Sequence, residues 1–91
     1  FLEFGALNCA ACKRMEKVLE EITANYSDKV NVLFINVTLP ENVDFAKYYG
    51  ISAIPTQILL NKTGKEFFRH TGFLSAYDLE KELLKNTINS E

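Results

Sequence analysis

Two cysteines separated by two residues are the side chains of this 91-residue sequence that most clearly suggest chemistry. Cys9 and Cys12 are its only cysteines. Disulfides that hold small secreted domains together close longer loops and come in larger numbers. A Cys-x-x-Cys pair closes too short a loop for that purpose. The pair therefore favours a chemical role, and thiol–disulfide exchange is the chemistry that suits it.

The pair lies where an expected strand, residues 1–5, gives way to an expected helix from Cys9 to about Asn25. Apolar residues recur there at helical spacing: Met15, Val18, Leu19 and Ile22. The start of a helix offers unpaired N–H groups and the positive end of the helix dipole, which stabilise a thiolate. We therefore expect Cys9 to attack a substrate disulfide. Cys12, one turn later and less exposed, is expected to resolve the mixed disulfide.

Two other interpretations of the cysteines remain open. A Cys-x-x-Cys pair can supply half of a zinc site, but zinc needs four ligands. The chain has no third cysteine, and its one histidine, His70, falls in a distant expected hairpin, where we expect a surface residue. Alternatively, the cysteines are inert core residues. Redox chemistry without a metal or an organic cofactor is the interpretation that we favour.

The later segments predict an α/β fold in the order β-α-β-α-β-β-α. The expected elements are a buried strand at 30–37, a short helix at 41–49 that Gly50 ends, strands at 56–60 and 66–71 joined by a turn at 61–64, and a last helix capped by Ser75 and Asp78 with Leu79, Leu83 and Leu84 facing inward. A helical crossover makes the first two strands parallel, and the tight turn makes the last two antiparallel. The result is a three-layer sandwich: a mixed four-stranded sheet with helices on both faces.

The length and the charge limit what else the chain can be. Residues 1–91 suffice for a single domain. A net charge of −2 argues against nucleic acid or an anionic membrane as a partner. No apolar run approaches the roughly 18 residues of a membrane span. Because the sequence begins at Phe1, inside an apolar run, we expect the domain to be cut from a longer protein.

Beyond the cysteines, several segments resemble the thioredoxin family. Residues 49–56 (YGISAIPT) are similar to the loop before the family's third strand, and the segments 62–65 and 71–73 also fit. The resemblance extends from Leu2 to about Leu84. It implies the thioredoxin-like sandwich described above.

The same resemblance implies a substrate-binding surface. Pro55 would form a cis peptide with Ile54 and pack beside the disulfide, and the backbone of Ile54 would pair with an extended peptide. Asn8, Ala10 and Ala11, which flank and separate the cysteines, are expected to contact substrate as well. The alternative for Ile54-Pro55 is an ordinary trans turn before a strand.

Glu3 is the only charged residue in the first strand, FLEFG. It resembles the buried carboxylate that in thioredoxins takes and returns the proton of the resolving cysteine. Desolvation would raise its pKa towards neutrality, as a general base for Cys12 requires. The alternative is a carboxylate at the end of a strand that reaches solvent.

These features predict a thiol–disulfide oxidoreductase that works in the reducing direction, as a monomer, on protein disulfides. An upstream reductase or a membrane electron donor would recharge it. The sequence departs from the family at Asn8 (usually Trp), at Ala10-Ala11 (Gly-Pro) and at Phe34 (often Lys). These departures argue against a generic cytosolic thioredoxin. The block 9–13 with Glu16, together with the segments 36–38 and 71–74, more closely resembles the extracytoplasmic thioredoxin-like domains, such as the C-terminal domain of membrane disulfide reductases. The alternative function is a binding module that presents its cis-proline groove and has idle cysteines.

Overall fold

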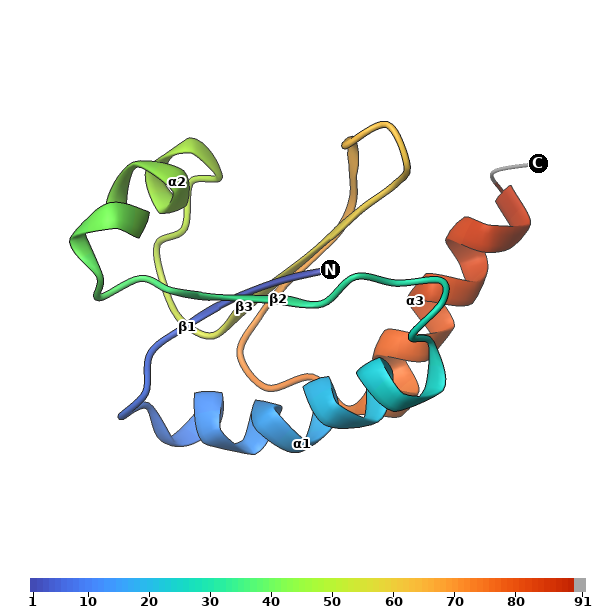
Figure 1. Cartoon of the computed structure of the whole chain (residues 1–91), viewed down its shortest axis with the longest axis horizontal. Helices are drawn as coiled ribbons and strands as arrows, with labels where there is room; N and C mark the ends of the chain where they lie inside the picture. The colour runs from blue at the N-terminus through green and yellow to red at the C-terminus, as the bar shows by residue number, and fades with distance from the viewer. Residues whose placement is uncertain (90–91) are drawn as a thin grey trace.

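Four strands form one mixed sheet in the order β2-β1-β3-β4 in the computed structural model, which describes residues 1–89 (Figure 1). The elements are, in chain order, β1 (Leu2–Gly5), α1 (Ala10–Asn25), β2 (Leu33–Asn36), the 3₁₀ turn η1 (Pro40–Asn42), α2 (Val43–Tyr48), β3 (Thr56–Leu60), β4 (Glu66–Thr71) and α3 (Ala76–Asn89). Strands β1 and β2 run parallel, whereas β3 is antiparallel to both β1 and β4. The predicted order of elements and strand directions are confirmed.

Helices cover both faces of this sheet (Figure 1). Helices α1 and α3 pack on one face, around a buried apolar cluster made of Phe1, Met15, Val18, Ile22, Leu59, Leu74, Leu79 and Leu83. Helix α2 packs on the other, over Leu2, Phe4, Ile35 and Ile58. We call these the α1/α3 face and the α2 face. Because successive side chains of a strand point to opposite faces, β1 contributes to both layers, as the predicted three-layer sandwich requires.

The two long helices begin close to the predicted positions, and the predicted cap of the last helix is confirmed. Cys9 is the N-cap of α1, and Ser75 Oγ accepts the N–H of Asp78 at 3.1 Å at the start of α3. Leu79 and Leu83 face the core as predicted, but Leu84 is exposed, so its predicted burial is wrong. Leu84 lies about 100° further round the helix than Leu83, which turns it away from the sheet.

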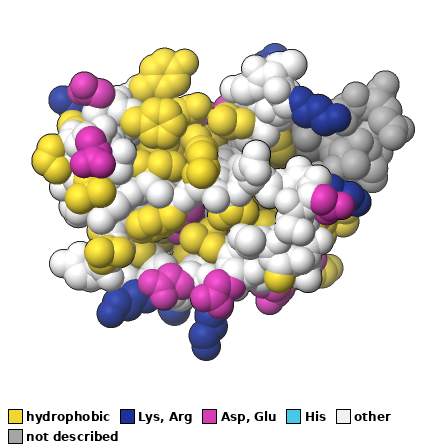
Figure 2. Space-filling view, in the orientation of Figure 1, with side chains coloured by type: hydrophobic (Ala, Val, Ile, Leu, Met, Phe, Trp, Pro, Cys, Tyr) yellow, Lys and Arg dark blue, Asp and Glu magenta, His cyan; other side chains and the backbone are white. Residues whose placement is uncertain are grey.

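The second strand is shorter and more exposed than the sequence predicts. Only Leu33–Asn36 pair with β1, and Leu33 and Phe34 are 57% and 44% exposed, respectively. The reason is the position of β2 at the edge of the described sheet, where it has one neighbouring strand. Val43 and Phe45 of α2 are also exposed, and Figure 2 shows hydrophobic side chains gathered on the side of the molecule where α2 lies.

The segment between β2 and β4 follows the predicted turns closely. The expected helix over 41–49 is divided into η1 and α2, and Gly50 ends it with a φ of 65°. The β3–β4 turn is held by Asn61, whose Oδ1 accepts the N–H groups of Thr63 and Lys65, both at 3.0 Å. Among the described residues, none of the helices has the length and apolarity needed to cross a membrane.

Candidate active site

The start of α1 holds the two cysteines in different environments. Cys9 has an extended backbone (φ −98°, ψ 124°), is half-buried, and accepts the backbone N–H of Cys12 on its Sγ at 3.2 Å. Cys12 is 4% exposed and lies one turn into the helix. Both thiols are free. The predicted difference in exposure between the two cysteines is confirmed.

These environments shift the two thiol pKa values in opposite directions. The pKa of Cys9 is lowered, first by a hydrogen bond from the Cys12 side chain and then by the backbone N–H groups of Cys12 and Ala11. Burial raises the pKa of Cys12 to about 11, and its hydrogen bond to Cys9 adds to the increase. Of the two thiols, Cys9 is therefore the one that ionises more readily, and it is also the more accessible one.

Gly5, at the end of β1, lets α1 approach the sheet closely at Cys12. A Cβ at this position would lie 3.2 Å from Cys12 Sγ and 3.1 Å from Cε1 of Phe34. Both distances are shorter than ordinary carbon contacts, so any side chain here would push against the thiol. Glycine therefore fixes how close Cys12 lies to the strand that carries Glu3.

Glu3 is completely buried in the middle of β1, so the alternative of a solvent-reaching carboxylate is wrong. Its Oε1 accepts a hydrogen bond from Gln57 Nε2 at 3.1 Å, and its Oε2 is buried with no partner in the described structure. Burial raises the pKa of Glu3 to about 7, against the lowering effect of the Gln57 hydrogen bond. The charge of Glu3 in turn raises the pKa of Cys9 and Cys12. The protonation of the buried carboxyl is therefore coupled to that of the two thiols.

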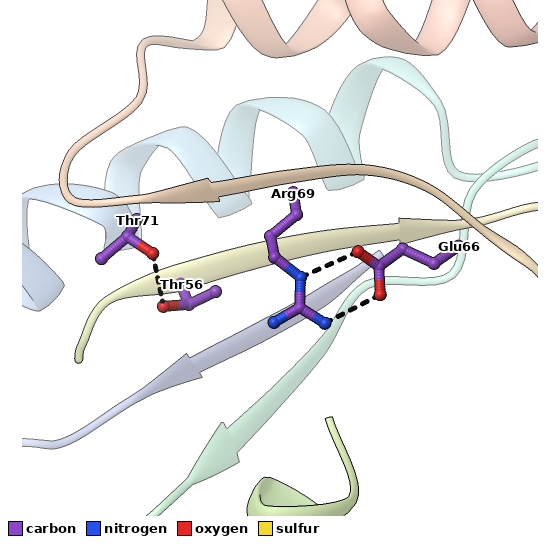
Figure 3. Close-up of polar contacts among 4 residues, drawn as sticks. All are labelled: Thr56, Glu66, Arg69 and Thr71. Atoms are coloured by element: carbon purple, nitrogen blue, oxygen red, sulfur yellow. Dashed lines mark hydrogen bonds and ion pairs between the residues drawn. The ribbon is translucent and has the colours of Figure 1, made fainter. Parts of the chain in front are cut away.

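The Ile54–Pro55 peptide is cis, so the alternative of a trans turn is wrong. The adjoining residues anchor the loop: Thr56 Oγ1 donates to Ala53 O at 2.6 Å and lies 3.2 Å from Thr71 Oγ1, a pair drawn in Figure 3. The N–H of Gly72 also donates to Pro55 O at 2.7 Å. The end of β4 thus holds the cis-proline loop in place.

The remaining predicted substrate contacts are accessible. Asn8 and Ala10 are exposed on either side of Cys9, whereas Ala11 and Ile54 are half-buried. Their contacts with a substrate stay predictions. Among residues 1–89, no group of three or more histidine, cysteine, aspartate or glutamate side chains is placed to hold a metal ion.

Two residues of this region were missed as site residues. Gln57 is fully buried, and its Oε1 lies 2.9 Å from Nδ1 of His70. His70 lies on the predicted hairpin, but it is half-buried and hydrogen-bonded rather than fully exposed. The available signal was Gln57 itself, a polar side chain in the apolar strand TQILL. A buried amide needs hydrogen-bond partners, and the neighbouring strands supply them.

With this geometry in view, comparison with known proteins identifies the family. Residues 1–87 match the family described as the thioredoxin-like domain. The chain belongs to that family. It is 38% identical over 88 residues to thioredoxin of Buchnera aphidicola subsp. Acyrthosiphon pisum, covering 97% of this chain and 78% of the relative. It is 34% identical over 85 residues to thioredoxin of Staphylococcus aureus, covering 93% and 79%.

Solved structures agree with these relatives. The thioredoxin NaTrxh from Nicotiana alata superposes with a TM-score of 0.79 and 40% sequence identity, covering 92% of this chain and 69% of that one. The domain is therefore a thiol–disulfide oxidoreductase with a thioredoxin fold. Thioredoxins as a class act on protein disulfides and are served by reductase partners.

Proposed function

We propose that this domain reduces protein disulfides, with Cys9 as the attacking thiolate, Cys12 as the resolving thiol and Glu3 as the base that takes the proton of Cys12. The observation that carries the proposal is the contrast between the two sulfurs. Cys9 is accessible and has a lowered pKa, whereas Cys12 is buried and has a pKa of about 11. Such a pair supports attack by the first sulfur and delayed attack by the second.

In the first half of the reaction, the Cys9 thiolate attacks one sulfur of the substrate disulfide. The substrate S–S bond breaks, a mixed disulfide forms through Cys9 Sγ, and the other substrate sulfur leaves as a thiolate. Before the attack, the N–H groups at the start of α1 stabilise the charge on Cys9. Ile54 and the cis-proline loop would orient the substrate peptide beside that sulfur.

In the second half, Cys12 must lose its proton. Two of the causes that raise its pKa, the hydrogen bond to Cys9 and the charge of Cys9, vanish once Cys9 is bonded to substrate. Glu3, with a pKa of about 7, is ionised for part of the time at neutral pH and can accept the proton. The Cys12 thiolate then attacks Cys9 Sγ and releases the second substrate thiolate. The substrate gains two electrons, and the domain becomes the Cys9–Cys12 disulfide.

The surroundings of Cys9 support the proposed reducing direction. Strong oxidants over-stabilise their thiolate, with a pKa near 3.5 and a potential of about −120 mV, against roughly 7 and −270 mV for a reducing thioredoxin. Ala10 and Ala11 supply no side-chain donor or charge, and the side chain of Lys13 is exposed to solvent, which screens it. We expect a midpoint of roughly −270 to −200 mV. Equilibration with glutathione, followed by alkylation and mass spectrometry, measures it, and a midpoint above about −150 mV would contradict the reducing assignment.

Reduction of insulin disulfides, with dithiothreitol as electron donor, tests the function itself. The domain should accelerate insulin precipitation, and Cys9→Ser should reduce the rate to that of dithiothreitol alone. Tyr77→Phe, an exposed position on α3, is a matched control that should keep full activity. No acceleration by the unmodified domain would instead favour a binding module with idle cysteines. The upstream electron donor, the monomeric state and a location outside the cytoplasm stay predictions.

A further inference from the structure

A row of three polar side chains crosses the sheet beneath the start of α1. Glu3 on β1 is directly opposite Gln57 on β3, and Gln57 is directly opposite His70 on β4. Glu3 alternates with Phe1 and Gln57 with Leu59, and both of these apolar residues belong to the α1/α3 cluster. The row therefore lies on the face that α1 covers. Hydrogen bonds connect its members, at 3.1 Å from Gln57 to Glu3 and at 2.9 Å between Gln57 and His70.

The neighbours of Gln57 allow only one orientation of its amide. Nε2 lies 3.1 Å from two oxygens, Oε1 of Glu3 and the carbonyl of Gly72. An NH₂ group donates two hydrogen bonds, so it satisfies both acceptors, whereas the carbonyl oxygen in the same place would face two oxygens. The amide oxygen must then face His70. Because that oxygen only accepts, Nδ1 of His70 must carry the hydrogen.

This chain of donors and acceptors distinguishes the two oxygens of Glu3. Oε1 is occupied by the hydrogen bond from Gln57, whereas Oε2 is buried and has no partner in the described structure. A proton on Oε1 would compete with the Gln57 donor, but a proton on Oε2 would not. The row thus leaves Oε2 as the oxygen that gains and loses the proton.

We propose that Gln57 and His70 are positioning residues for Glu3: Gln57 holds Oε1 so that Oε2 exchanges the proton with Cys12, and His70 locks the amide of Gln57 in the orientation that does so. The proposal rests on the proposed role of Glu3 as base. It assigns no proton transfer to Gln57 or His70, neither of which needs to contact substrate. Their effect reaches the reaction through the carboxyl.

Among the described residues, the titratable groups that influence the protonation of Glu3 can be identified, and the experiment can fix the state of the cysteines. Cys9 and Cys12, at the start of α1, interact with its charge. On the sheet, β2 contributes the uncharged segment LFIN, β3 contributes Gln57, and β4 contributes His70 through Gln57. Titrating the protein with both thiols reduced, and again with both alkylated, separates the cysteines from the row.

The test is a titration of the Glu3 carboxyl carbon, followed by ¹³C NMR in the whole chain. The hydrogen bond from Gln57 favours the ionised carboxylate, so Gln57→Leu should raise the midpoint of Glu3 by about one pH unit. His70→Leu should raise it by a smaller amount, because Gly72 still holds one N–H of Gln57. In His70→Asn, the amide nitrogen is as many bonds from the backbone as Nδ1, so this variant should restore the original midpoint.

Turnover supplies the second readout. If Glu3 is the base, the rise of insulin reduction with pH should move with the Glu3 midpoint in each variant. Arg69→Gln is the matched control, since Arg69 is the neighbour of His70 on β4 but pairs with Glu66, at 2.8 Å, as Figure 3 shows. It should change neither readout. Because His70 is only half-buried, the comparison of His70→Leu with His70→Asn remains available even if Gln57→Leu does not fold.

The outcomes separate this inference from the proposed function. A Glu3 midpoint that stays constant in Gln57→Leu, or in both His70 variants if Gln57→Leu does not fold, would overturn the positioning role. A fall in turnover in Glu3→Gln would still support the base. A midpoint that moves while the pH profile of turnover does not would overturn the role of Glu3 as base and, with it, the catalytic purpose of the row. Movement of both, with recovery in His70→Asn, supports the two proposals together.

Discussion

The two faces of β1 bury different kinds of side chain, an aromatic ring on one face and a carboxyl group on the other. On the α2 face, the ring centroid of Phe4 lies 5.8 Å from those of both Phe45 and Tyr49, and Phe4 belongs to the apolar cluster under α2. On the α1/α3 face, the adjacent residue is Glu3, which is equally buried but carries a carboxyl. The same strand thus secures the fold on one side and carries the titratable part of the site on the other.

The two residues affect the stability of the fold differently, because only Glu3 is titratable. Apolar burial at Phe4 stabilises the fold at any pH. Glu3 has a pKa of about 7 in the folded chain against an ordinary value of 4.5, so the folded state holds the proton more tightly. Stability therefore falls as pH rises from about 4.5 to about 7, because the carboxyl must ionise in a buried place. Below that range the penalty is absent, and above it the penalty is complete.

The largest effect is expected on the apolar side. Phe4→Ala removes a fully buried ring and leaves a cavity under α2, which should lower the free energy of unfolding by about 3–5 kcal/mol. Because no titratable group is involved, the loss should be the same at pH 5 and at pH 8. Urea denaturation at both pH values measures it. A stability loss that differs by more than about 1 kcal/mol between pH 5 and pH 8 would contradict the claim that the contribution of Phe4 is independent of pH.

The next effect is expected at Glu3 and has the opposite sign. Glu3→Gln keeps the shape and removes the charge, so it should raise the free energy of unfolding by about 3 kcal/mol at pH 8 and leave it unchanged near pH 4.5. Turnover near pH 7 should fall by about a hundredfold, since the base is gone. Denaturation curves and insulin reduction across this range measure the two quantities. Full activity would contradict the role of Glu3 as base, and equal stability at pH 8 would contradict the cost of burying its charge.

A smaller effect is expected at Gly5, which belongs to the α1/α3 face. Gly5→Ala would bring a Cβ within 3.2 Å of Cys12 Sγ and 3.1 Å of the Phe34 ring, and should lower stability by about 1 kcal/mol. It should also slow the release of substrate from the mixed disulfide, because Cys12 is displaced. Quenched-flow alkylation follows that step. The same change in a Phe34→Ala background removes the ring contact, so any slowing that remains comes from Cys12, and no slowing in either background would contradict the close fit.

The cysteines, Glu3 and the cis-proline loop could be predicted because each carries a local signal. Cys9 stands at the start of an amphipathic helix, Glu3 is the single charge in an apolar strand, and the residues around Pro55 resemble a known loop. Secondary structure was predictable for a similar reason, since the period of apolar residues changes from strand to helix. These signals need no knowledge of which strands are neighbours.

What could not be predicted depends on those neighbours. The hydrogen bonds from Glu3 through Gln57 to His70 exist only because β1, β3 and β4 are adjacent and paired in this register. Glu3 and Gln57 are 54 residues apart in the sequence. The exposure of Phe34 has the same origin. The apolar segment 30–37 predicts a buried strand. In the structure, β2 is at the edge of the described sheet, and a strand with one neighbour exposes part of its side chains.

The central claim is that Cys9 attacks and Cys12 resolves, and trapping of the mixed disulfide tests it most directly. Cys12→Ser and Cys9→Ser would each be mixed with an excess of a disulfide-containing protein at pH 7, quenched with acid and examined by mass spectrometry. Cys12→Ser should accumulate a covalent complex through Cys9, because the second attack is lost. Cys9→Ser should accumulate almost none, because Cys12 is buried and remains protonated at this pH. Equal trapping by both variants, or trapping by Cys9→Ser alone, would contradict the assignment.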